Sequence, residues 1–323
     1  MEGLGFIHEK LDIKILILFI LRRLPAAIDG EKLADLVLID GGIGYFDYKE
    51  CLAELADSSQ VEETEDGYII TAKGSRNCEI VESSLPYSVR TKAERAAGPV
   101  AEEEYVLETP HGEGRLVLRR PETDPLAVLL LSHGAGGGIE APDLAALARD
   151  LPAQGVAVGL FEQPWRRAGR RLATAPKTLD AALVVAAGRV REEFPDVPLV
   201  LGGRSAGARS ACRSALVVGA SGVLALAFPL HPPGRPERSR LEELTTAGVP
   251  TLVLQGERDT FGRPEEFPDD VELGVVPGGD HSFAVLKRGD VTADDALAVI
   301  VESTLEWVVR QGAGTTEEEA RLC

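Results

Sequence analysis

Short apolar runs alternate with segments of helical periodicity through the last two thirds of the chain. The runs have the length of strands that are buried on both faces, and the segments between them are long enough for helices. The expected strands are Ala127–Leu131, Val156–Phe161, Leu199–Gly202, Val223–Phe228, Thr251–Gln255 and Val271–Val276, and the expected helices are Pro142–Pro152, Thr178–Glu193, Ser205–Val218, Glu237–Thr246 and Ala293–Arg310. An antiparallel pair, Tyr105–Glu108 and Arg115–Arg119, precedes them. This alternation predicts an α/β fold with a doubly wound, mostly parallel sheet, in which ligands bind at the carboxyl ends of the strands.

The first third of the chain has a different pattern, in which helices come first and a hairpin follows. Apolar residues from Ile13 to Leu24 recur at helical spacing until Pro25. Further helices are expected at Gly30–Leu38, at Asp47–Ala56, and from Gly74 to about Arg95 with a break near Pro86; strands are expected at Val61–Thr64 and Tyr68–Thr71, with a two-residue turn at Asp66-Gly67. The order helix, helix, helix, hairpin predicts a small α+β winged-helix domain.

The composition of the chain changes where the pattern changes. Eleven of the thirteen isoleucines lie in residues 1–95, whereas 21 of the 26 arginines lie beyond them. Residues 96–104, AAGPVAEEE, are typical of a linker. We therefore expect a fusion of a winged-helix domain at residues 1–95 with an α/β domain at residues 105–310, joined by a linker at 96–104 and followed by a flexible tail at 311–323.

The stretch after the strand Leu199–Gly202 carries the pattern of a nucleophile elbow. Residues 203–207, GRSAG, fit G-x-S-x-G and open an expected helix. In such a turn a strained backbone exposes the serine hydroxyl, and a Cβ at either glycine would crowd it. Serine is also a common helix cap, so Ser205 needs catalytic partners elsewhere in the chain before it is interpreted as a nucleophile.

Two later stretches supply those partners. Asp259 follows the strand Thr251–Gln255, and His281 follows the strand Val271–Val276. In a serine triad the histidine takes the proton of the hydroxyl and later returns one to the leaving group, while the carboxylate fixes the tautomer of the imidazole. We predict Ser205, Asp259 and His281 as the catalytic residues. Glu257 is the alternative acid, and Asp280 is expected to brace the loop of His281.

A glycine-rich loop, SHGAGGG at residues 132–138, follows the strand Ala127–Leu131. Such a loop lets backbone N–H groups approach a developing oxyanion. We expect the oxyanion hole to consist of the N–H groups of Ala135 and Ala206, the residue after the nucleophile. Gly134 is then expected beside the substrate, and His133 is expected to shape the loop rather than to transfer protons.

The same loop could be interpreted as a dinucleotide fingerprint followed by Glu162, but Ile139 stands where that pattern needs a glycine. The four cysteines are scattered and have no metal-ligand spacing, which favours reduced thiols. We therefore expect no cofactor and no metal.

These motifs together resemble the α/β-hydrolase superfamily. The resemblance covers about residues 100–310 and is carried by LLLSHGAGGG, FEQPWRRAGRR, LVLGGRSAGARSA, FPLHPPGRPE, LVLQGERDTFG and GGDHSF. It is strongest to the lidless branch that is related to dienelactone hydrolases and includes testis-expressed hydrolase-like proteins. The resemblance implies acyl transfer from an ester, thioester or peptide-like substrate. Some relatives use a cysteine nucleophile where this chain has Ser205.

Other residues near the expected strand ends are candidates for substrate binding. Arg166, Arg167, Arg170 and Arg171 form a basic cluster after the strand Val156–Phe161; they are either a solvated loop or a grip for an anionic substrate group. His231 follows another strand and either lines the pocket or holds a turn. His8 and His111 have no motif around them and are expected at the surface. The segment between Leu230 and Val249 is too short for a cap domain, so we expect an open site.

The first domain resembles a family of small bacterial winged-helix proteins of unassigned function. The stretches GYFDY, YIITAKG and LPYSVR, within residues 44–90, carry this resemblance. Residues 1–95 hold 18 acidic and 11 basic residues, and the expected third helix exposes mainly acids. This charge favours dimerisation or protein contact over DNA binding.

The net charge of −18 also disfavours binding to nucleic acid or an anionic membrane. The apolar run Ile15–Leu21 is too short to span a bilayer and lacks a cleavage site after it, so a buried helix is expected there. The expected reduced thiols favour a cytoplasmic protein. The sequence thus predicts a serine hydrolase of a small ester-like substrate. The alternatives are a ligand-sensing transcriptional regulator without catalysis and a protein-interaction scaffold.

Overall fold

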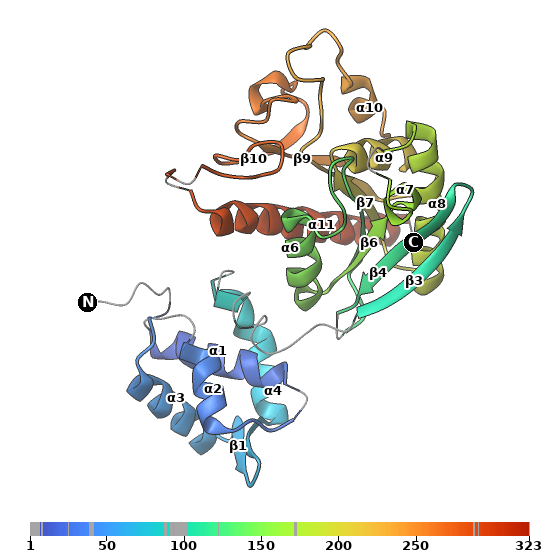
Figure 1. Cartoon of the computed structure of the whole chain (residues 1–323). Helices are drawn as coiled ribbons and strands as arrows, with labels where there is room; N and C mark the ends of the chain where they lie inside the picture. The colour runs from blue at the N-terminus through green and yellow to red at the C-terminus, as the bar shows by residue number, and fades with distance from the viewer. Residues whose placement is uncertain are drawn as a thin grey trace. The chain divides into compact units, whose positions relative to one another are not determined.

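The computed structural model describes residues 7, 9–24, 26–38, 42–86, 89–90, 93, 102–121, 123–170, 173–286, 288–289 and 291–322, and the side chains of all of these except 83 and 312–322. The chain divides into two compact units, Met1–Pro99 and Val100–Cys323 (Figure 1). Most of the expected linker, residues 96–101, lies outside the described residues, and its last three residues begin the first strand of the second unit.

The first unit is built around its first helix. Its elements are α1 (Lys10–Arg22), α2 (Gly30–Val37), α3 (Tyr45–Asp57), β1 (Val61–Thr64), β2 (Gly67–Ile70), α4 (Ala72–Val81) and the 3-10 turn η2 (Glu82–Ser84). Helix α1 contacts α2, α3, α4 and β2, and its residues from Ile15 to Leu21 are all buried. This explains why the apolar run is almost continuous: the helix is covered on nearly every side. The elements follow the predicted order of three helices and a hairpin.

The turn of the hairpin is not the one predicted. Thr64 pairs with Gly67, so the two turn residues are Glu65 and Asp66, and the prediction of Asp66-Gly67 is wrong by one residue. Gly67 is needed in the strand itself, because its φ is +117° and a Cβ there would lie 2.1 Å from the carbonyl oxygen of Ile28. Ile28 exchanges two backbone hydrogen bonds with Tyr68, which brings a third segment against the hairpin.

The second unit is an eight-stranded sheet with helices on both faces. Its strands are β3 (Glu102–Thr109), β4 (Gly112–Arg119), β5 (Ala127–Ser132), β6 (Val156–Glu162), β7 (Leu199–Arg204), β8 (Gly222–Leu226), β9 (Thr251–Gly256) and β10 (Glu272–Val276), in the spatial order β10-β9-β8-β7-β5-β6-β4-β3. The strand β4 is antiparallel to both neighbours, and β5 to β10 are parallel. The predicted doubly wound α/β fold is confirmed.

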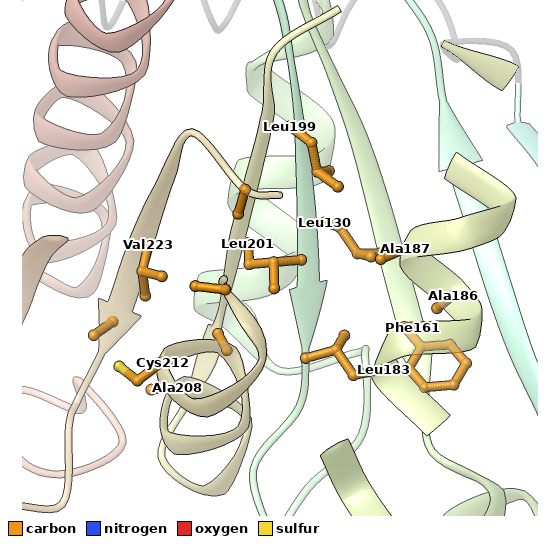
Figure 2. Packing of buried hydrophobic residues seen from close by; sticks show 14 of the residues in the cluster. Leu130, Phe161, Leu183, Ala186, Ala187, Leu199, Leu201, Ala208, Cys212 and Val223 are labelled. Atoms are coloured by element: carbon orange, nitrogen blue, oxygen red, sulfur yellow. The ribbon is translucent and has the colours of Figure 1, made fainter. Parts of the chain in front are cut away.

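The helices of this unit are α6 (Pro142–Asp150), α7 (Pro164–Arg167), α8 (Pro176–Glu193), α9 (Ala206–Ser214), α10 (Leu241–Thr245) and α11 (Ala293–Leu322), with 3-10 turns η3 (Pro152–Gln154) and η4 (Pro264–Glu266). Helices α8 and α9 contact each other and bury one face of the sheet (Figure 2). Leu130 and Leu201 point to this face, where they meet Leu183 of α8 and Ala208 of α9. Helices α6 and α11 contact each other and the strands β6 and β5, respectively.

Several helix ends differ from the prediction. Helix α9 ends at Ser214 rather than Val218, and Leu216 and Val217 beyond it are exposed. Helix α10 is shorter than expected, and the short helix α7 was not expected. Helix α11 extends past Arg310 into the expected tail, where residues 317–322, EEEARL, have high helix propensity. Within the described part of the chain, no helix combines the length and the apolar character that crossing a membrane requires.

Candidate active site

Ser205 lies in a strained turn between β7 and α9. Its backbone has φ 54° and ψ −109°, a conformation that L residues rarely adopt. Its N–H donates to the carbonyl of Leu226 on the neighbouring strand β8, at 2.9 Å. A Cβ at Gly203 or Gly207 would lie 2.4 Å or 2.1 Å, respectively, from the carbonyl oxygen of Ser132. Both glycines are therefore required by the close approach of β5 to this turn.

The structure brings the three predicted catalytic residues together from three strand ends. The hydroxyl oxygen Oγ of Ser205 lies 3.0 Å from Nε2 of His281. The other ring nitrogen, Nδ1, lies 2.8 Å from Oδ2 of Asp259. The imidazole thus bridges the hydroxyl and the carboxylate, in the order that proton transfer from the serine to the histidine requires.

The carboxylate of Asp259 is fully buried and is held by hydrogen bonds besides that of His281. The side-chain amide of Gln255 donates to Oδ2 at 2.9 Å, and the backbone N–H of Phe261 donates to Oδ1 at 2.8 Å. These donors compensate the loss of water around a buried charge. The role of Gln255 was not predicted, although a polar residue at the end of the apolar run TLVLQ is a signal for it.

The ring of His281 stacks on that of Phe261, with centroids 4.1 Å apart and planes inclined by 25°. The loop around the histidine is braced by Asp280, whose Oδ1 accepts the N–H groups of Ser282 and Ala284. Glu257, the alternative acid, accepts the N–H of Gly278 at 2.7 Å instead of contacting the imidazole. Its position is that of a loop brace, and Asp259 is the acid that the structure places on His281.

The glycine-rich loop lies against the turn of Ser205. A Cβ on Gly134 would be 3.3 Å from the carbonyl oxygen of Arg204 and 3.4 Å from Cβ of Ser205. Ala135 is exposed, and Ala206 is the first residue of α9, where backbone N–H groups have no partner within the helix. The N–H of Ala206 is therefore not used by the hydrogen bonds of its own helix, as a donor to an oxyanion requires.

His133 is buried and holds the shape of this loop. Its Nδ1 lies 2.8 Å from the carbonyl oxygen of Gly134, and its Nε2 accepts the backbone N–H of Gln163 at 3.0 Å. Burial lowers the pKa of His133, which favours its neutral form. The side chain of Gln163 donates to Oγ of Ser132 and to the carbonyl of Leu179, so this glutamine fastens the loop to the neighbouring strand and helix. This role of Gln163 was not predicted from the sequence.

The arginine cluster is partly engaged in ion pairs. Arg166 lies 3.1 Å from Glu140 and Arg167 lies 3.5 Å from Glu113. Arg171 is outside the described residues. A cavity of about 410 Å³ lies between the β3–β4 turn, α7 and the start of α8, and its lining includes Arg167, Arg170, His111, Trp165 and Thr178. His111, which was expected at the surface, is exposed. The other histidine expected there, His8, lies outside the described residues.

His231 makes contacts that hold two loops together. Its Nε2 lies 2.8 Å from Glu266, its Nδ1 lies 3.0 Å from the carbonyl of Pro232, and its backbone N–H donates to Phe261. The hydrogen bond to the Pro232 carbonyl, followed by the contact with Glu266, raises the pKa of His231 above its usual value. Of the two predicted roles, lining the pocket or holding a turn, these contacts are those of a histidine that holds a turn.

Comparisons with known proteins agree with this architecture. The model of the family described as alpha/beta hydrolase domain matches residues 125–309, and the model of a domain of unknown function, DUF4364, matches residues 13–104. No curated protein matches the sequence.

Two solved structures are similar to the second unit. A dienelactone hydrolase from Anabaena variabilis is 19% identical, with a TM-score of 0.51, over 66% of this chain and 99% of the other. The esterase domain of a protein from Rhodothermus marinus is 17% identical, with a TM-score of 0.50, over 65% of this chain and 98% of the other. At these identities the likeness is one of fold.

Proposed function

Because the chain belongs to the alpha/beta hydrolase domain family through residues 125–309, we propose that it is a serine hydrolase that cleaves a small ester or thioester through an acyl-enzyme. The observation that carries the proposal is the continuous contact from the hydroxyl of Ser205 through His281 to the buried carboxylate of Asp259. A structural serine at a helix start would need neither this contact nor a strained backbone.

In the proposed reaction, His281 Nε2 removes the proton of Ser205 as Oγ attacks the carbonyl carbon of the substrate. The N–H groups of Ala135 and Ala206 stabilise the oxyanion that forms. His281 then gives the proton to the leaving alcohol or thiol, which departs and leaves the acyl group on Oγ. A water molecule, deprotonated by the same nitrogen, attacks the acyl carbon and releases the acid and the free serine.

We propose a small acyl group because little structure is inserted near the site. Between β8 and β9 the described chain holds only the short helix α10, Leu241–Thr245, and the turns around it. A sealed acyl tunnel would need a larger insertion. Esters of short acids are therefore the expected substrates, and higher activity on long-chain than on short-chain p-nitrophenyl esters would contradict this part of the proposal.

The first unit is proposed to serve dimerisation or regulation rather than DNA binding. Asp47, Glu50 and Asp57 on α3 are exposed, and Glu50 pairs with Lys10 of α1 at 2.5 Å. A helix that enters the major groove needs basic or amide side chains at such positions.

A fluorophosphonate probe tests the proposal, because it reacts covalently with activated serines. The full-length chain should be labelled and should hydrolyse p-nitrophenyl acetate, and Ser205→Ala should lose both properties. Ser214→Ala is a matched control: Ser214 is a buried serine of α9, the helix that follows Ser205, and among the described residues its hydroxyl has no hydrogen-bond partner. Equal labelling of wild type and Ser205→Ala, or no labelling of the folded wild type, would refute the proposal.

A further inference from the structure

The side chain of Arg204, the residue before the proposed nucleophile, contacts the histidine loop. Arg204 is the last residue of β7, and its side chain is 12% exposed. Its Nη2 donates to the backbone carbonyl of His281 at 2.9 Å. The next residue, Ser205, contacts the imidazole of the same histidine. Two consecutive residues therefore hold His281 at two points, one on its main chain and one on its ring.

Arg204 is held in turn by a buried carboxylate. Oδ2 of Asp143 lies 3.5 Å from Nε of Arg204, and Asp143 is 1% exposed. Neither carboxylate oxygen of Asp143 has a hydrogen bond of good geometry among the described residues, so the nearby backbone N–H groups of Asp143 and Leu144 and the guanidinium of Arg204 compensate its charge. Burial raises the pKa of Asp143, whereas the guanidinium of Arg204 opposes this change. Removal of either partner leaves the other as a poorly solvated charge.

The position of Asp143 lets this ion pair connect segments that are far apart in the sequence. Asp143 is the second residue of α6, the helix that begins where the glycine-rich loop ends. The Asp143–Arg204 pair therefore connects three segments: the loop that carries Ala135, the turn that carries Ser205 and the loop that carries His281. These three segments carry every protein group of the proposed reaction except the acid of the triad.

We propose that Arg204, oriented by Asp143, is a positioning residue that fixes the imidazole of His281 relative to the hydroxyl of Ser205. This inference rests on the proposed serine hydrolase function. The hydroxyl–imidazole contact depends on short distance and good alignment. Arg258 fixes the other side of the histidine loop through the carbonyls of Gly278 and Ala284. On the side of β7, Arg204 is the side chain that holds the main chain of the histidine itself.

A lysine would not replace this arginine. The guanidinium donates through Nη2 to the carbonyl of His281, while its Nε lies 3.5 Å from Oδ2 of Asp143 at ion-pair distance and forms no hydrogen bond among the described residues. The ammonium of a lysine is a compact charge, and it could not contact both acceptors at the same time. Arg204→Lys is therefore expected to recover only part of the activity that Arg204→Met loses.

The test compares Arg204→Met with Arg209→Met, using p-nitrophenyl acetate and the full-length chain. Arg209 is also a partly buried arginine near the elbow, but its partner is Glu243 on α10. We expect Arg204→Met to lower kcat about 10- to 100-fold with KM changed less than about threefold, because a small misplacement of a catalytic group has effects of this size. Arg209→Met should keep kcat within about twofold, since its partners lie outside the proposed reaction centre.

A second readout does not need turnover. The proton on Nδ1 of His281, a nitrogen that lies 2.8 Å from Oδ2 of Asp259, should give a downfield proton NMR signal that is identified by its loss in His281→Ala. This signal should weaken through faster exchange in Arg204→Met and persist in Arg209→Met. If the wild type had no esterase activity, the proposed function would fail, but the NMR comparison would still decide whether Arg204 holds the histidine.

Equal kcat and an equal downfield signal in Arg204→Met and the wild type would overturn the inference. If Arg204→Met does not fold, Asp143→Asn gives the deciding measurement, because it keeps the shape of the side chain and removes its charge. We expect it to lower kcat about 3- to 10-fold through a less well oriented Arg204. Unchanged kcat and an unchanged signal in Asp143→Asn would then overturn the inference.

Discussion

At the scale of single residues, the backbone of Ser205 stores strain that a glycine would release. Its φ of 54° and ψ of −109° cost a non-glycine residue about 1–3 kcal/mol. Ser205→Gly should therefore have a higher free energy of unfolding than Ser205→Ala by about 1–2 kcal/mol, although both variants lack the hydroxyl. Urea denaturation of the two variants measures this difference. A Ser205→Ala variant that is at least as stable as Ser205→Gly would show that the turn is not strained.

The arginines that follow β6 allow a prediction about substrate charge. Arg167 and Arg170 line the cavity beside α7, and Arg167 has only the exposed Glu113 as its carboxylate partner among the described residues. The double change Arg167→Ala and Arg170→Ala should lower the rate on a p-nitrophenyl ester of succinic acid about tenfold relative to p-nitrophenyl acetate, since a charged hydrogen bond contributes about 1.5–3 kcal/mol. Arg235→Ala, at an exposed position of another loop, is the control. An unchanged ratio of the two rates would exclude an anion-binding role.

Some residues of the proposed site could be predicted from the sequence, and others could be found only in the structure. Ser205, Asp259 and His281 stand in motifs that follow strands, so local pattern and chain order identify them. Arg204, Gln255 and Gln163 act through contacts with residues far along the chain or with backbone carbonyls. Such contacts leave no local pattern in the sequence, because every residue has a backbone carbonyl and the partner can therefore be of any type. The geometry of the folded chain is needed to find them.

At the scale of elements, an ion-pair network joins α8, α9 and α10. Glu243 accepts from Arg209 at 2.9 Å and from Arg213 at 2.5 Å, and Arg213 also pairs with Asp180 of α8 at 2.7 Å. Burial alone would raise the pKa of Glu243, but the hydrogen bonds and charges of the two arginines outweigh it and hold the pKa below its usual value. The network therefore fastens the helix that follows Ser205 to both of its neighbours.

The lowered pKa of Glu243 determines how the free energy of unfolding changes with pH. The folded state binds the proton of Glu243 less tightly than the unfolded state, so the stabilisation is present above the unfolded pKa and is lost as the pH falls through the folded pKa. Glu243→Gln should lower the free energy of unfolding by about 1–3 kcal/mol at pH 7 and by less below about pH 4. Denaturation at several pH values measures this, with the exposed neighbour Glu242→Gln as the control. A loss that is independent of pH would contradict the assignment.

Strands and the ends of helices such as α3 and α8 were predictable to within a few residues, whereas the hairpin turn and the ends of α9 and α10 were not. A buried strand needs an apolar run of the right length, and runs such as Leu199–Gly202 are easily recognised. The hairpin turn was misplaced because Gly67 suits a two-residue turn, but in the fold it is required by the approach of Ile28. The apolar residues Leu216 and Val217 extend the helical pattern past Ser214, but in the fold they lie beyond α9 and are exposed.

At the scale of the whole molecule, each unit has its own hydrophobic core. One cluster of buried residues is built from α1, α3 and their neighbours, and another from the sheet, α8 and α9. All residues of the proposed site, including Arg204 and Asp143, belong to the second unit. Because the second unit has its own core and holds every residue of the proposed site, we expect it to fold and to react without the first unit.

A fragment of residues 101–323 should therefore fold alone and react with the fluorophosphonate probe at a rate within about twofold of the full chain, because each domain with its own core can fold independently. Residues 1–99 alone should also unfold cooperatively, which circular dichroism measures. If the first unit serves dimerisation, sedimentation should show that the full chain and residues 1–99 are dimers, whereas residues 101–323 are monomers. A folded fragment that has lost its reactivity would mean that the first unit acts on the hydrolase site. Regulation would then be the better account of the fusion.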